Sequence, residues 1–223
     1  MVIRSASLAA TSSTGQTAAR YTSDPHLKHR LAVELNKEVV EKVLECIRDL
    51  CDEMGPGAIE EHLEWIVVSL EQLLDKTAPC QTGKGMDDDG PEEQGEDDSG
   101  DDEEDDDEDL DHDEIILGNS TDLIVSLSKC LQDSFMPYLQ RLGPRLVKYV
   151  GDDHPKSDKI MVIGCLGETF NQCPASMTVY FNDFYQVLLK HSTSSDGSLN
   201  RNVAYAIAVC ADKAPAEVFG PHL

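Results

Sequence analysis

Apolar residues recur with one shared spacing in three stretches of the chain. In 135–146, 177–188 and 59–70 they stand at positions i, i+4, i+7 and i+11. This spacing places the side chains on one stripe of an amphipathic helix. The stripes are Phe135, Leu139, Leu142 and Leu146; Met177, Phe181, Phe184 and Leu188; and Ile59, Leu63, Ile66 and Leu70. The pattern therefore predicts three amphipathic helices.

The stripes repeat with a constant period, because Phe135, Met177 and Phe219 are each 42 residues apart. A second set of apolar segments lies between them, and glycines and prolines mark the breaks. The second set covers 39–54, 115–130, 157–171 and 199–213. Two helices in a period near 42, with no alternating strand pattern, are typical of HEAT or armadillo-type repeats. We therefore predict an all-α fold, a HEAT-repeat α-solenoid.

One interval between stripes is longer than the others. Leu63 precedes Leu139 by 76 residues, 34 more than the period. Between Asp87 and Glu114, 20 of 28 residues are Asp or Glu, and none is Lys or Arg. Such a run repels itself and has almost nothing apolar to bury. We therefore predict a disordered acidic loop at 82–114, inserted within one repeat.

The predicted organisation has four parts. These are a poorly structured segment 1–32, HEAT helices at 33–81, the acidic intra-repeat loop at 82–114 and HEAT repeats at 115–223, truncated within the last one. Leu223 falls where the first turns of another helix are expected. Because each HEAT unit buries its apolar face on its neighbours, we expect a piece of a longer solenoid.

The formal net charge of −25 is concentrated in the insertion. Outside 87–114, 23 acidic and 18 basic side chains remain. A flexible anion attracts basic proteins and repels nucleic-acid phosphates. We therefore expect basic protein partners and no direct nucleic-acid binding. The alternative is a loop that only keeps the protein soluble.

Little in the sequence points to catalysis. The seven cysteines show no CxxC spacing, and most lie in apolar runs, as buried reduced thiols do. The histidines lack metal-ligand spacing, and no GxSxG, P-loop or GxGxxG motif occurs. The longest apolar stretches fall short of the ~20 residues of a membrane span. We predict no enzyme, no catalytic residue, no metal or cofactor and no membrane association.

Four segments resemble karyopherin-β nuclear import receptors. "KIMVIGCLGE" at 159–168 and "LNRNVAYAIAVCAD" at 199–212 are similar to inner-face HEAT helices of this family. "DSFMPYL" at 133–139 and "APCQ" at 78–81 are similar to its importin-four-type histone importers. The resemblance covers 36–223 and implies the C-terminal half of such a receptor. It implies outer helices at 58–77, 135–150 and 175–192, and inner helices at 36–54, 115–131, 157–172 and 198–213.

The resemblance also implies a function. Such receptors shuttle between cytoplasm and nucleus, and we expect basic cargo such as histones H3/H4 or ribosomal proteins. Nucleoporins and Ran-GTP would be partners of the full-length receptor only, because the Ran-binding repeats belong to the N-terminal half. We expect a monomer. The alternatives are a HEAT-repeat protein–protein scaffold and an acidic histone chaperone without a transport role.

Candidate cargo-binding residues lie on the inner helices and in the loop. Glu168 and Asn202 match inner-helix positions of the family, where a carboxylate holds an ammonium group and an amide holds an extended backbone. Asn202 ends the motif Leu199-Asn200-Arg201-Asn202, in which the arginine stands one position later than in the family. We add Asp122 and Asn171, for which an ordinary surface role is the alternative. The loop candidates are Asp101, Asp102, Glu103, Glu104, Asp105, Asp106, Asp107, Glu108 and Asp109.

Overall fold

A computed structural model describes residues 34, 36–83 and 103–222, with side chains described outside 103–111. The predicted N-terminal segment and loop residues 84–102, including the candidates Asp101 and Asp102, lie outside the described residues.

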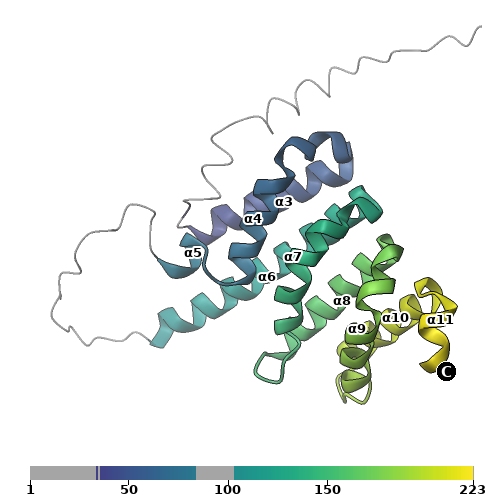
Figure 1. Cartoon of the computed structure of the whole chain (residues 1–223). Coiled ribbons are helices and arrows are strands. Elements are labelled where there is room, and N and C mark those ends of the chain that lie inside the picture. Colours follow the sequence, from purple (N-terminus) through teal and green to yellow (C-terminus); the bar gives the residue numbers. More distant parts are fainter. Residues whose placement is uncertain (1–33, 35, 84–102, 223) are drawn as a thin grey trace, which may run out of the picture.

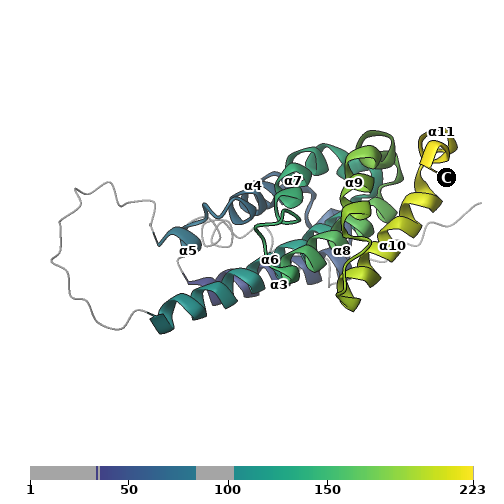
Figure 2. The same cartoon turned by 90° about the horizontal axis from the view of Figure 1, so that it is seen from below.

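The described helices form two rows (Figures 1 and 2). The inner row consists of α3 (Lys37–Met54), α6 (Glu103–Leu131), α8 (Lys156–Gln172) and α10 (Gly197–Lys213). The outer row consists of α4 (Leu63–Leu74), α7 (Met136–Lys148), α9 (Met177–His191) and the short α11 (Ala216–Phe219). The described part of the chain contains no strand. The predicted all-α solenoid is therefore confirmed.

Short elements connect the rows. The four-residue helix α5 (Pro79–Thr82) follows α4. The 3-10 turns are Pro56–Ala58, Glu60–His62, Gln132–Phe135, Pro174–Ser176 and Gly220–His222. The outer helix expected from residue 58 is α-helical only from Leu63. Gly55 has a φ of 72° and Pro56 follows it, so the chain passes through two 3-10 turns before the α-helix begins.

Capping residues fix where two inner helices begin. The Asn36 side chain accepts a hydrogen bond from the Val39 N–H at 3.1 Å and so caps α3. Asp196 caps α10 by accepting from the N–H groups of Ser198 and Leu199 at 2.9 and 3.0 Å. The bonds from Leu199 and Ser198 lower the pKa of the Asp196 carboxyl, so the cap stays ionised at neutral pH.

The predicted apolar stripes form the core between the rows. All twelve stripe residues are at most 5% exposed. The buried faces of the inner helices join them in one continuous apolar cluster. Burial of these side chains is the main source of stability, at about 25 cal/mol for each Å² of apolar surface removed from water.

Contacts between neighbouring repeats preserve the 42-residue period. Cys173 Sγ donates to the Gln132 carbonyl at 2.9 Å, and Asn202 Nδ2 donates to the Ile160 carbonyl at 2.8 Å. These pairs are 41 and 42 residues apart. Across the insertion the Tyr149 hydroxyl donates to the Leu74 carbonyl at 2.7 Å, over 75 residues. The extra residues therefore leave the stacking register unchanged.

Ion pairs join the outer helices α4 and α7 across the insertion. Arg141 Nε and Nη2 donate to the two Glu71 carboxylate oxygens at 3.1 and 2.6 Å. Arg145 Nε lies 2.7 Å and Lys148 Nζ 3.0 Å from Asp75. The hydrogen bonds from Arg141 lower the pKa of Glu71. Burial pushes the pKa of Asp75 up, but the bonds from Arg145 and Lys148 outweigh it, and the net shift is downward.

Helix α6 begins earlier than the sequence indicated. It starts at Glu103 instead of 115, so 103–114, part of the predicted loop, is helical. Acidic residues are favourable in the first turns of a helix because of the helix dipole. Further along, Asp113 pairs with Lys37 at 3.4 Å and with Lys76 at 3.3 Å. These ion pairs hold the helix against α3 and the end of α4.

Inner helices pack against one another more extensively than the outer helices do. Among the residues described, no helix combines the length and apolar character that crossing a bilayer requires.

Candidate functional site

A groove runs across the inner helices α6, α8 and α10. It has a volume of about 500 Å³ and is open along one side. Its polar lining includes Asp122 from α6, Glu168 from α8, and Asn202 and Tyr205 from α10. Its apolar lining includes Val125 and the part of α8 around Met161. Three helices thus present carboxylates, an amide and a phenol to one open surface.

Glycines of α8 let α10 approach closely enough to form this groove. A Cβ atom at Gly164 would lie 3.3 Å from Asn202 Nδ2, and one at Gly167 would lie 3.3 Å from the Ala206 Cβ. The Tyr205 ring lies 3.5 Å from that same Cβ position. Larger residues would therefore push α10 away from α8.

Asn202 lies half-buried where α10 crosses α8. Its Nδ2 donates to the Ile160 carbonyl at 2.8 Å, which uses one of the two amide N–H groups. The amide therefore fixes α10 on α8 and also borders the groove.

Glu168 and Tyr205 form the central polar pair. The Tyr205 side chain is 38% exposed. Burial raises the pKa of Tyr205 to about 12, and a hydrogen bond to the Glu168 carboxylate, with its charge, adds to the shift. The phenol therefore stays protonated at neutral pH. Asn171 Nδ2 lies 3.5 Å from the Tyr205 hydroxyl and completes the cluster.

Asp122, which α6 contributes to the groove, is exposed. Its Oδ2 is 3.5 Å from Arg48 Nη1 on α3. Arg48 Nη2 also lies 3.2 Å from Asp49 on its own helix. Asp122 therefore shares the positive charge of Arg48 with Asp49.

The candidate residues predicted from the sequence separate into three groups. The groove unites Asp122, Glu168 and Asn202, and Asn171 contacts its edge through Tyr205. The loop candidates from Glu103 to Asp109 belong to the first turns of α6, and their side chains lie outside the described residues. Tyr205 is not among the residues predicted from the sequence. It follows Asn202 by three residues, a spacing that places both on one face of a helix.

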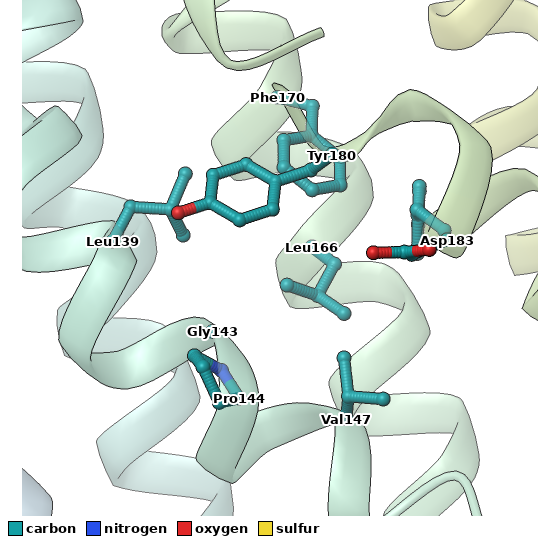
Figure 3. A pocket seen from close by; sticks show the side chains of 9 residues that line it. Leu139, Gly143, Pro144, Val147, Leu166, Phe170, Tyr180 and Asp183 are labelled. Carbon is teal, nitrogen blue, oxygen red and sulfur yellow. The ribbon is translucent and has the colours of Figure 1, made fainter.

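A second, apolar cleft lies between the outer helices (Figure 3). Its volume is about 400 Å³, and Asp183 is its acidic member. Gly143 and Pro144 leave little side-chain bulk in the middle of α7, so the cleft reaches Leu166 and Phe170 of α8. The Phe170 ring packs edge-on against Phe184 at a centroid distance of 4.7 Å. The cleft therefore offers an aromatic floor.

The buried thiols show no sign of activation. Burial raises the pKa of Cys51, Cys165 and Cys173 to about 12, which keeps them protonated and weakly nucleophilic at neutral pH. In the part of the chain that the structure describes, no group of three or more His, Cys, Asp or Glu side chains could hold a metal ion.

The two rows of paired helices define the class of protein, a HEAT-type α-solenoid with an insertion in one repeat. The profile of the Importin repeat 6 family matches residues 39–152, more than half of the chain. The chain therefore belongs to the importin family, as the resemblance predicted. Over 99 residues, 44% of this chain, it is 23% identical to a protein described as "Probable importin subunit beta-4" from Schizosaccharomyces pombe. The matched stretch makes up 9% of that protein's length.

Proposed function

We propose that this chain is a cargo-binding part of a nuclear transport receptor, and that the groove across α6, α8 and α10 holds an extended basic segment of the cargo. The observation that carries the proposal is the meeting of Asp122, Glu168 and Asn202 in one groove. Carboxylates attract ammonium and guanidinium groups, and an amide pairs with peptide backbone. The groove uses its residues for binding and not for catalysis.

The acidic insertion supports the same proposal. It holds 20 carboxylates in 28 residues, and its last residues form the start of the inner helix α6. A concentrated anion raises the local concentration of cationic partners and speeds their encounter, with strong salt dependence. The insertion would attract basic cargo electrostatically, and the groove would bind it.

Basic proteins such as histones H3/H4 and ribosomal proteins fit this chemistry. Their Lys- and Arg-rich segments match both the insertion and the groove. Membership in the importin family supports a receptor that moves between cytoplasm and nucleus. The apolar cleft between α7 and α9 is suited to the phenylalanine side chains of nucleoporin repeats, because its floor is aromatic.

The test is titration calorimetry of the chain with a histone H3 tail peptide at low and physiological salt. We expect saturable binding that survives physiological salt and that Glu168→Gln weakens about tenfold, the effect of losing one charged hydrogen bond. Binding that vanishes with salt, or that Glu168→Gln leaves unchanged, would contradict a cargo groove.

Binding measurements with further peptides distinguish the two alternative functions. A protein–protein scaffold would show no preference for Lys-rich peptides over neutral peptides of equal length. A histone chaperone without a transport role would bind the basic peptide but not a Phe-Gly repeat peptide. A receptor should bind both, and Val147→Glu at the cleft should abolish only the second interaction, because it introduces a charge into apolar lining.

A further inference from the structure

The carboxylates of the inner row differ in how their charge is compensated. Toward α3, Asp122 faces Arg48 at 3.5 Å, and Asp52 faces Lys129 at 3.9 Å. Asp52 also accepts a hydrogen bond from Ser126 at 3.2 Å. Each of these carboxylates therefore lies near a cation of the protein itself, and Arg48 is shared between Asp122 and Asp49.

The carboxylate that α8 contributes to the groove has different surroundings. Among the described residues, the ion pairs of the inner row do not include Glu168. It lines the groove together with the neutral phenol of Tyr205, which does not cancel its charge. The Tyr205 ring, 38% exposed, adds an aromatic surface on which a cation can rest.

We infer that Arg48 is a specificity-determining residue of the groove: it occupies the cation position at Asp122, so that a basic ligand is anchored at Glu168 and Tyr205. The inference rests on the proposed function, since it concerns how the same groove selects its ligand. Arg48 would act as an internal competitor, and a ligand cation reaches Asp122 only when the arginine turns away.

The geometry makes this competition reversible. Arg48 is 30% and Asp122 is 64% exposed, and the contact of 3.5 Å is a single, non-bidentate one. Arg48 already donates to its neighbour Asp49 at 3.2 Å, so it can release Asp122 without losing all ion pairing. Such a contact is as weak as other exposed ion pairs, so a ligand that carries a second cation at the right spacing can displace it.

A double-mutant cycle tests the inference. Affinity for the histone H3 tail peptide is measured by calorimetry for the wild type, Arg48→Gln, Asp122→Asn and the double variant. Lys42→Gln is the matched control, because it removes one positive charge from the same helix. Lys42 is 72% exposed and pairs with Glu45, on its own helix, at 2.9 Å. Circular dichroism checks that each variant remains helical, and Arg48→Met serves as a second neutral replacement.

The expected result is that Arg48→Gln strengthens binding about two- to fivefold, the range of an exposed ion pair, and clearly more than Lys42→Gln. In the Asp122→Asn background the gain should fall to that of the control. Equal gains from Arg48→Gln and Lys42→Gln, or a gain that persists without the Asp122 charge, would overturn the inference while leaving the groove intact. Absence of binding to the wild type would instead overturn the proposed function and the inference with it.

Discussion

Gly167 and Asn202 show how single residues set the distance between α8 and α10. Gly167, on α8, leaves room for α10, and Asn202, on α10, donates a hydrogen bond to the Ile160 carbonyl of α8. Neither role follows from residue type alone. Sequence reasoning placed Asn202 in the groove through a family resemblance, but its bond to α8 required the distance between the two helices.

Gly167→Val should destabilise the fold. The added side chain meets the Ala206 Cβ, which belongs to the opposing helix and has no rotamer to move to. We expect the free energy of unfolding to fall by about 1–3 kcal/mol, the usual cost of overpacking. Urea denaturation followed by circular dichroism measures it. Gly197→Ala is the control, because nothing lies within 4 Å of its Cβ position. A stability equal to that of the control would show that α8 and α10 are not in tight contact at Gly167.

Substitutions of Asn202 and Glu168 should affect different properties, the first the stability of the fold and the second the binding of the peptide. Asn202→Ala removes the hydrogen bond to the Ile160 carbonyl and should lower the free energy of unfolding by about 1 kcal/mol. Glu168→Gln keeps the volume of the side chain. It should leave the denaturation midpoint unchanged and lower the affinity for the basic peptide. If Glu168→Gln instead lowered the midpoint as much as Asn202→Ala, the carboxylate would have a structural role.

The helices that carry a periodic apolar stripe could be predicted from the sequence. All three stripes are buried, and the 34-residue excess coincides with the segment between the outer helix α4 and the inner helix α6. The start of α6 was missed because an acidic run is typical of disorder. The ion pairs of Asp113 that hold this helix come from Lys37 and Lys76, far away in the sequence. Tyr205 and Arg48 were missed for the same reason, since their roles depend on contacts between side chains.

The outer ion pairs predict how stability depends on pH. The folded-state pKa values of Glu71 and Asp75 lie below their ordinary values of 4.5 and 3.8. Their contribution is therefore present above these ordinary values and is lost as pH falls through the lowered ones. Arg141→Ala should lower the free energy of unfolding at pH 7 by about 1–2 kcal/mol. The difference from wild type should shrink by pH 3.

Denaturation at several pH values makes that comparison. Lys42→Ala, which removes an exposed pair within one helix, serves as the control and should change little at any pH. A loss for Arg141→Ala that is the same at pH 7 and pH 3 would show that the arginine acts through packing and not through its ion pair with Glu71.

At the scale of the whole molecule, the insertion and the groove should have separable kinetic roles. Changing the ten acidic residues of 87–102 to Asn or Gln keeps the chain length and leaves α6 and the Asp113 pairs in place. Helicity should be unchanged. Association with a basic peptide at low salt should slow by about tenfold, because electrostatic steering is lost, while dissociation should stay nearly constant.

Stopped-flow fluorescence at several salt concentrations measures both rates. At high salt the neutralised variant and the wild type should associate equally fast, because screening removes the steering in both. An unchanged association rate combined with faster dissociation would place the insertion in the bound interface instead.

The central claim, that the inner surface holds the basic ligand, is tested most directly by photo-crosslinking from two matched positions. A photoreactive amino acid replaces Val125, which lines the groove, or Val179, which is 57% exposed on the outer helix α9. The account predicts that a histone H3 tail peptide is captured from position 125 and not from position 179. Equal capture from both positions, or capture from 179 alone, would contradict it.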